Sequence, residues 1–231
     1  MVRIVIAVVF TIILNAAWAG DFEDGAAAIN RKDYATALAK FRSAAQQGVA
    51  RAQYNLGVMY EQGQGVAQDY KEAVLWYQMA AQQGNANAQH NLGVMYRNGQ
   101  GVAQDYKEAV LWYQMAAQQG NANAQNNLGA MYQNGRGVAQ DYKEAVRWYR
   151  LAAQQGLAPA QYNLGVMYEN GQGVLQDHSR AHMWFNIAAV GGDKDSVKNR
   201  DIAASKMTAQ QIEQAQRMAR ECMSSNFTKC D

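Results

Sequence analysis

Apolar positions recur at a helical period through most of the chain. In the segment 85–97, the side chains with this spacing are Ala88, Leu92, Met95 and Tyr96. A short glycine-containing segment, 98–102, follows, and a second helical pattern extends from Asp105 to Gly120. Such stripes predict two amphipathic helices joined by a short turn. Gly120 is predicted to end the second helix, because glycine suits the left-handed position after a helix.

Nearly the same letters return every 36 residues. The units 52–87 and 88–123 are identical at 33 of 36 positions, while 124–159 and 160–195 diverge further. A fixed period of this length indicates one supersecondary unit stacked on copies of itself. Each helix has only about three turns and is marginal alone, so neighbouring pairs must supply the missing core.

The predicted fold is therefore all-α, a right-handed α-solenoid of antiparallel helix pairs. Residues 20–51 are expected to form an entry helix pair before the four units. Residues 196–231 are expected to form capping helices after them. Thr208 and Gln211 predict a capping box at the start of the last helix.

Other residues mark predicted helix ends and contacts. Asp105 and Glu108 suggest a capping box at the start of a second helix. Glycine also recurs in the middle of the first helices, where it costs about 1 kcal/mol relative to alanine. This repetition predicts a close helix approach that a Cβ would block. The glycines are Gly57, Gly93, Gly129 and Gly165, and the large side chains expected as their counterparts are Trp76, Trp112, Trp148 and Trp184.

The glycine-rich segment between the two helices invites a different interpretation. The letters GQGVAQ resemble part of a dinucleotide-binding fingerprint, but that motif needs a preceding strand. Here the segment joins two helical patterns and occurs once in each of four units. It therefore predicts a tight helix–helix turn rather than a phosphate loop.

These motifs together resemble a known family. Asn-Leu-Gly-x-Met-Tyr, Gly-x-Gly-Val, Asp-Tyr-x-x-Ala-x-x-Trp-Tyr and Ala-Ala-x-x-Gly are similar to the Sel-one-like repeat, a relative of the tetratricopeptide repeat. The resemblance covers residues 52–195, and residues 21–51 resemble a shorter tetratricopeptide-type entry. It implies a non-enzymatic adaptor that assembles or regulates other proteins at a bacterial envelope. Exported cysteine-rich relatives are described as penicillin-binding or weakly β-lactamase-like, but they have a disulfide in each repeat, which this chain lacks.

Differences between the copies fall on one face of the first helix. We expect Ala52, Leu56 and Tyr60 to face the paired helix, and the divergent positions to face elsewhere. Two columns diverge, with valines beside them: Tyr54, His90, Asn126 and Tyr162; Glu61, Arg97, Gln133 and Glu169; and Val58 and Val94. Constant core positions with one varied face suggest a surface that binds a peptide or protein partner. Drift of solvated positions after duplication would give the same pattern, so both interpretations stay open.

The N-terminus predicts export. Arg3 precedes the apolar segment 4–14, and Ala17 and Ala19 form a small-x-small cleavage site. Removal of this signal peptide, residues 1–19, would place the mature chain in the periplasm or outside the cell. The alternative is an uncleaved anchor, but the apolar run is shorter than the roughly 20 residues of a spanning helix. No second segment of the sequence is apolar enough to span a bilayer.

Two cysteines lie near the C-terminus. In an exported protein an even number suggests a disulfide, here between Cys222 and Cys230. Two free thiols, or pairing with another chain, are the alternatives. The bridge would fix the last helix and take no part in chemistry.

Composition and spacing argue against several other functions. Removing Arg3 lowers the formal net charge from +2 to +1, too weak a field to hold nucleic acid. His178 and His182 have the spacing of a two-histidine metal face, but only Asp177 lies nearby as a third ligand. There is no serine elbow and no His-Glu-x-x-His. We therefore predict no catalytic residue, metal or cofactor.

Two rival functions stay open beside the adaptor. One is binding of cell-wall fragments, and the other is a penicillin-binding or β-lactamase-like envelope hydrolase. A sugar platform would use a column of aromatic side chains, but the column here is better explained as core. Its members are Tyr60, Tyr96, Tyr132 and Tyr168.

Overall fold

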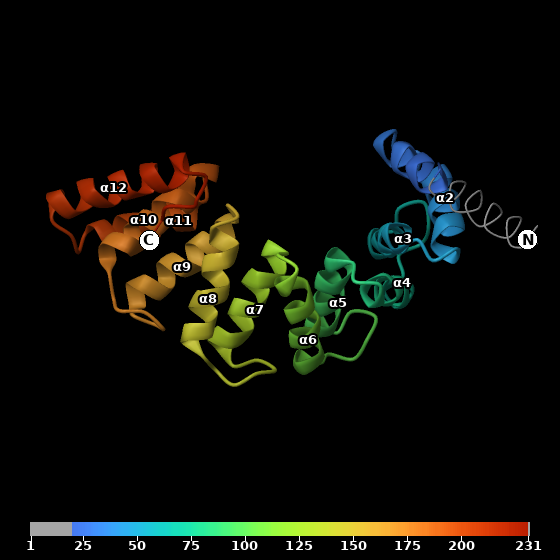
Figure 1. Cartoon of the computed structure of the whole chain (residues 1–231), viewed down its shortest axis with the longest axis horizontal. Coiled ribbons are helices and arrows are strands. Elements are labelled where there is room, and N and C mark those ends of the chain that lie inside the picture. Colours follow the sequence, from blue (N-terminus) through green and yellow to red (C-terminus); the bar gives the residue numbers. More distant parts are fainter. Residues whose placement is uncertain (1–19, 231) are drawn as a thin grey trace, which may run out of the picture. The chain divides into compact units, whose positions relative to one another are not determined.

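The computed structural model describes residues 20–230, and every regular element in that range is helical (Figure 1). Residues 20–30 form the first described helix. The others are α2 (Tyr34–Gln46), α3 (Ala50–Gln62), α4 (Tyr70–Gln82), α5 (Ala86–Asn98), α6 (Tyr106–Gln118), α7 (Ala122–Asn134), α8 (Tyr142–Ala153), α9 (Ala158–Asn170), α10 (His178–Ala188), the 3-10 turn η1 (Ala189–Gly191), α11 (Lys194–Ala204) and α12 (Ala209–Ser224). The all-α prediction is confirmed. The predicted signal peptide lies outside the described residues.

Contacts divide the described residues into two compact units, residues 20–112 and 113–230. In the first unit α2 packs on α3, α3 on α4, and α4 on α5. In the second, α7 packs on α8, α8 on α9 and α9 on α10, and α10 also contacts α11 and α12. Within each unit these helices pack on their neighbours in sequence, as in an α-solenoid. We call α3, α5, α7 and α9 the first helices of repeats 1 to 4, and α4, α6, α8 and α10 their second helices.

An aspartate begins the second helices. The Asp105 carboxylate accepts hydrogen bonds from the backbone N–H groups of Lys107 (2.8 Å) and Glu108 (3.1 Å), as expected for an N-cap. The backbone N–H of Asp105 donates to the carbonyl of Tyr96 at 2.9 Å, so it is already used and cannot serve the Glu108 side chain. The aspartate cap is therefore present without the predicted reciprocal bond. The complete capping box is formed at Thr208 and Gln211.

The glycine-rich segment forms the predicted turn between helices. Gly99 ends α5 in the left-handed conformation, with φ +70°, and Gly101 has φ +73°. A Cβ on Gly101 would lie 2.2 Å from the carbonyl oxygen of Tyr70, at the start of the preceding second helix. Both the backbone angle and the close approach therefore require glycine here.

The glycines in the middle of the first helices face aromatic rings. A Cβ would lie 2.6 Å from the ring of Tyr77 if added at Gly57, and 2.7 Å from the ring of Phe185 if added at Gly165. The predicted close approach is confirmed, but the predicted counterparts were wrong. In repeats 1, 3 and 4 the ring in contact belongs to the residue after the tryptophan, because successive helical side chains point about 100° apart. Trp76 instead packs against the cluster that contains Phe41 and Leu56.

A buried glutamine links each second helix to the next first helix. The four members, Gln53, Gln89, Gln125 and Gln161, are all less than 5% exposed. The Gln125 side-chain amide donates to the carbonyl oxygen of Ala117 at 3.1 Å and accepts from Gln155 at 2.8 Å. The Ala117 carbonyl also accepts from the backbone N–H of Gly120 at 3.0 Å, so the glutamine supplies a second hydrogen bond to this buried helix end. Glutamine resembles a surface residue in sequence, so this role was not predicted.

Residues of the C-terminal segment complete the core of the second unit. Cys222 is fully buried in α12 and is bonded to Cys230. Between them Phe227 packs against this core, and its ring lies beside Gly156. The last helix and the tail thus cover apolar side chains of repeat 4.

Candidate functional site

The predicted partner-binding residues lie on one side of the first helices, and all of them are half-buried. This helix-one face comprises Tyr54, Val58 and Glu61 on α3, His90, Val94 and Arg97 on α5, Asn126 and Gln133 on α7, and Tyr162 and Glu169 on α9. The side chains are neither core nor freely solvated. All of them retain some accessible surface, and most also make a contact described below.

The first column contacts the next repeat. Asn163 donates its side-chain N–H to the Asn126 side-chain oxygen at 2.9 Å, and Asn199 donates to the Tyr162 hydroxyl at 2.8 Å. Burial raises the pKa of Tyr54, the Glu61 charge adds to this, and a hydrogen bond with Asn91 opposes it. The variable column therefore pairs with asparagines spaced at the repeat period. That spacing was visible in the sequence, and it is the signal that could have revealed these contacts.

The second column caps a buried phenol. The Tyr77 hydroxyl donates to the Glu61 carboxylate at 2.5 Å, and the Tyr149 hydroxyl donates to the Gln133 side-chain oxygen at 2.6 Å. Burial raises the pKa of Tyr77 strongly, and the hydrogen bond and charge of Glu61 raise it further. These phenols therefore stay protonated and act as donors. Substitution in this column changes the acceptor offered to the tyrosine as well as the surface.

Repeat 4 departs from this arrangement because Phe185 has no hydroxyl. The Glu169 carboxylate instead accepts from Lys206 and lies 3.0 Å from the His178 Nδ1 atom. Burial of Glu169 would raise its pKa, but the hydrogen bonds from Lys206 and His178 outweigh it, so the pKa lies below the usual range. Through Lys206, these contacts link the turn between α11 and α12 to Glu169 of repeat 4.

The helix-one face borders a hollow in each of the two units. The first, of about 230 Å³, is lined in part by Ile29, Phe41 and Val58. The second, of about 240 Å³, is lined in part by Tyr162 and Glu169, and the lining also includes Val166, Asn199 and Ile202. Three of the predicted residues thus border concave apolar surface. Each hollow can accommodate a side chain of a bound segment.

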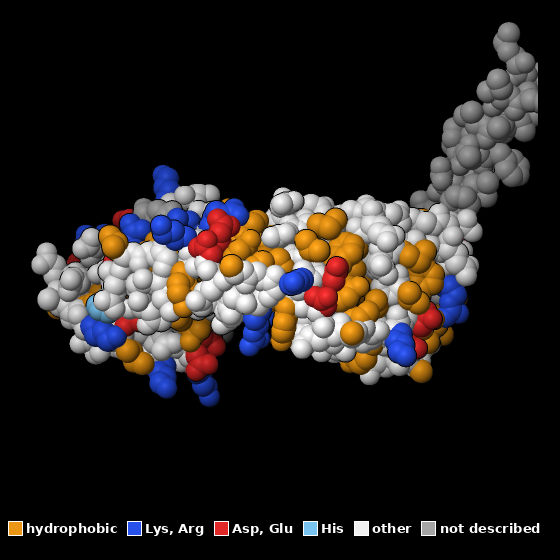
Figure 2. All heavy atoms as spheres, turned by 90° about the horizontal axis from the view of Figure 1, so that it is seen from below, with side chains coloured by type: hydrophobic (Ala, Val, Ile, Leu, Met, Phe, Trp, Pro, Cys, Tyr) orange, Lys and Arg blue, Asp and Glu red, His pale blue; other side chains and the backbone are white. Residues whose placement is uncertain are grey.

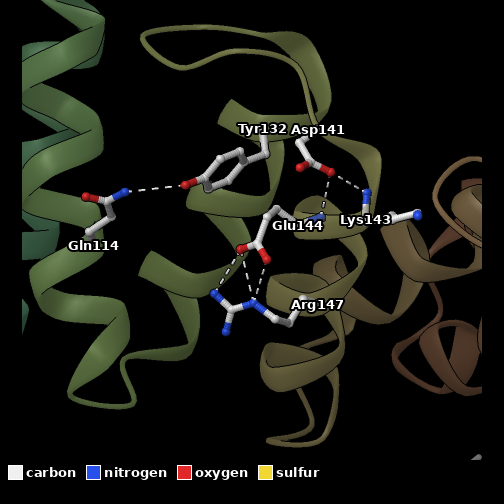
Figure 3. A network of polar contacts seen from close by, with 6 residues as sticks. All are labelled: Gln114, Tyr132, Asp141, Lys143, Glu144 and Arg147. Carbon is white, nitrogen blue, oxygen red and sulfur yellow. Dashed lines mark hydrogen bonds and ion pairs between the residues drawn. The ribbon is translucent and has the colours of Figure 1, made fainter.

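The aromatic column is less buried than predicted. Tyr168 is buried, but Tyr60, Tyr96 and Tyr132 are only half-buried. In Figure 3, the Tyr132 hydroxyl points toward the Gln114 side chain on α6, 3.5 Å away. The same view shows Asp141 capping α8. It also shows the Glu144 carboxylate bound by the Arg147 guanidinium.

The two histidines of the candidate metal pair differ in surroundings. His178 contacts Glu169, whereas His182 is 2% exposed and its Nδ1 atom has no hydrogen-bond partner among the described residues. Burial lowers the pKa of His182, and the nearby Arg200 charge lowers it further. Among residues 20–230 no three His, Cys, Asp or Glu side chains are arranged to hold a metal ion.

The surface mixes charges and apolar side chains. On the face seen in Figure 2, basic and acidic side chains lie near one another, with hydrophobic patches between them. In the described part of the chain, no helix combines the length and the apolar character needed to cross a bilayer.

The sequence profile of the Sel1 repeat matches residues 50–85, 86–121, 122–157 and 158–193. Each matched segment begins two residues before the corresponding repeat unit predicted from the sequence. The chain belongs to the Sel1 repeat family. Proteins with this repeat are generally scaffolds for protein–protein interaction, and the fold is typically non-enzymatic.

Solved structures of family members are similar to this chain. The crystal structure of c5321, a protective antigen present in uropathogenic Escherichia coli strains, is 36% identical with a TM-score of 0.78. The match covers 83% of this chain but only 42% of that protein, so this chain spans less than half of it. A Sel1 repeat protein from Oxalobacter formigenes is also 36% identical, with a TM-score of 0.72, over 76% of this chain and 70% of that one.

More distant structures share the fold alone. The immunity protein Pa5087 from Pseudomonas aeruginosa is 23% identical with a TM-score of 0.51, and the match covers 78% of this chain and 68% of that one. A search of curated proteins finds no match.

Proposed function

We propose that the chain is a non-enzymatic scaffold that binds a peptide or protein segment on the helix-one face. The observation that supports this most directly is the position of the two hollows. Each is bordered by residues at which the repeats differ or by their valine neighbours, and each combines apolar walls with polar atoms at the rim. Concave surface of this composition suits an extended or helical segment.

The varied columns supply specificity in this proposal. Their contacts with asparagine and tyrosine fix the orientation of each side chain, and the accessible part of each faces the bound segment. Because Glu61, Arg97 and Gln133 occupy equivalent positions, one scaffold presents a different charge at each repeat. Substitutions at these positions alter recognition without altering the repeat core.

The chain itself provides a mild test variant. His90→Asn together with Arg97→Gln gives repeat 2 the side chains that repeat 3 has at Asn126 and Gln133. We expect normal folding by circular dichroism and weaker crosslinking capture of partners from the native envelope. A matched control is Lys107→Ala, an exposed position on a second helix. Undiminished capture by the double variant would remove this face from consideration.

We further propose that the scaffold works outside the cytoplasm. The sequence pattern of residues 1–19 and the pairing of Cys222 with Cys230 support this, because disulfides persist in oxidising compartments. N-terminal sequencing of the protein from its native cells should read Gly20 first. Recovery of an intact N-terminus from the cytosolic fraction would contradict the proposal.

A further inference from the structure

The second helices differ in how their tryptophan is covered. In repeat 3, the Arg147 guanidinium lies 4.0 Å from the centre of the Trp148 ring. It also donates to both oxygens of Glu144, at 2.9 to 3.1 Å (Figure 3). Trp148 is only 7% exposed. An arginine of the chain itself therefore occupies a site made by a carboxylate and an indole four residues apart on one helix.

Repeats 1 and 2 have the same carboxylate and indole but no arginine. Glu72 and Trp76 on α4 correspond to Glu144 and Trp148, and Leu75 stands in place of Arg147. Leu75 is 53% exposed and Trp76 is half-buried. Within residues 20–230 no ion pair involves the Glu72 carboxylate, although the same carboxylate in repeat 3 has one. The sequence of α6 is identical to that of α4 from Tyr106 to Gln118.

Glu72, Leu75 and Trp76 border a hollow on the surface of α4. A cavity of about 390 Å³ on α4 is lined by Glu72, Leu75, Trp76, Gln78, Met79 and Gln82. It has a carboxylate at one end, an indole and two flexible apolar side chains in the middle, and amides at the other end. On α6 the copies Leu111 and Met115 are 53% and 44% exposed, much like Leu75 and Met79.

In repeat 4 the equivalent site is covered within the chain. Met183 and Trp184 are buried, and α10, which contains them, packs against α11 and α12. Arg180 replaces the carboxylate at this position. Repeats 3 and 4 are therefore closed by the chain itself, whereas repeats 1 and 2 remain open.

We propose that Glu72 and Trp76, and their copies Glu108 and Trp112, each bind an arginine side chain of a partner protein segment. The guanidinium lies on the indole and pairs with the carboxylate, as Arg147 does in repeat 3. A planar guanidinium suits both contacts, because it stacks on aromatic faces and binds carboxylates through two N–H groups. Apolar neighbours of that arginine contact Leu75 and Met79. This surface lies on the second helices and is separate from the helix-one face.

A peptide library tests this surface in isolation. Phage displaying random dodecapeptides are first depleted on the Leu75→Arg, Leu111→Arg double variant and then selected on the wild-type mature protein. The variant places an arginine where repeat 3 has one, so it should fold and carry its own occupant at both sites. Depletion removes peptides that bind the helix-one face, so failure here is distinguishable from failure of the proposed function.

We expect the retained peptides to be enriched in arginine next to apolar residues. The affinity of these peptides for the Glu72→Gln, Glu108→Gln double variant should be about tenfold lower than for the wild type. A tenfold loss corresponds to the removal of one charge-assisted hydrogen bond. Glu144→Gln should leave affinity unchanged, because Arg147 already occupies that carboxylate. Conversely, Arg147→Leu should raise the number of peptides bound per chain by one in titration calorimetry.

Three results would overturn the proposal. One is that no peptide survives depletion, or that the survivors lack arginine. Another is equal affinity for the wild type and the double glutamine variant. The third is self-association of the wild-type chain that the double arginine variant abolishes, since the occupant would then be a second copy.

Discussion

Replacing Gly165 by alanine tests the close packing of the two helices of a repeat. The new Cβ would lie 2.7 Å from the Phe185 ring, about 0.7 Å closer than the 3.4 Å at which ordinary contact begins. Phe185 is 1% exposed, so its ring cannot move toward solvent. Overpacking of this kind costs about 1–3 kcal/mol. Alanine recovers about 1 kcal/mol of helix propensity. We therefore expect a net loss of up to about 2 kcal/mol.

The assay is urea denaturation of the full mature chain, followed by circular dichroism and by tryptophan fluorescence. Phe185→Leu provides the second arm of a double-mutant cycle, because it removes the ring that the Cβ would meet. In that background Gly165→Ala should be neutral or stabilising. If alanine stabilises the wild type, or costs the same free energy in both backgrounds, the glycine is not required by the ring and the packing argument fails.

Three further changes test other contacts. Gln125→Leu should lower the free energy of unfolding by about 1–3 kcal/mol, since it removes two hydrogen bonds, one to the Ala117 carbonyl and one from the Gln155 amide; a loss below about 0.5 kcal/mol in urea would show that these bonds contribute little to stability. His182 has a lowered pKa in the folded state, so its contribution to stability is present above the unfolded pKa of about 6.5 and is lost as pH falls below it. His182→Val, the residue of the other three repeats, should flatten the fall in melting temperature between pH 7 and pH 5, and an unchanged slope would assign it to other groups. Cys222→Ser should lower the free energy of unfolding by about 2–3 kcal/mol, because it opens the loop between two cysteines that are eight residues apart. Reduction of the wild type should lower its melting temperature by the same amount as the substitution does. If reductant destabilised the wild type and the variant equally, the disulfide would be excluded as the cause.

Most features of the fold depend on interactions between residues close together in the sequence, so the sequence by itself determined them. The 36-residue period, the apolar stripes and the aspartate caps fix which segments are helical and which neighbours they meet, because each helix needs the next one to bury its stripe. The glycine turn is also a local matter, since only glycine adopts those backbone angles without cost. The mid-helix glycines indicated a close approach before any packing was known.

The tertiary structure decided which side chains meet. A rotation of about 100° between adjacent helical residues separates Tyr77, which contacts Gly57, from Trp76, which contacts a different cluster. Gln125 on α7 is buried because its side chain reaches the Ala117 carbonyl on α6. The pattern of residues within a single helix does not specify such a contact with another helix. Likewise, the segment from Glu72 to Trp76 differs from its copy in repeat 3 only at Leu75, where that copy has Arg147. The tertiary structure shows that this one difference leaves the first site open and the second occupied. Helix period determines faces, whereas contacts between faces depend on how neighbouring helices are oriented as they pack.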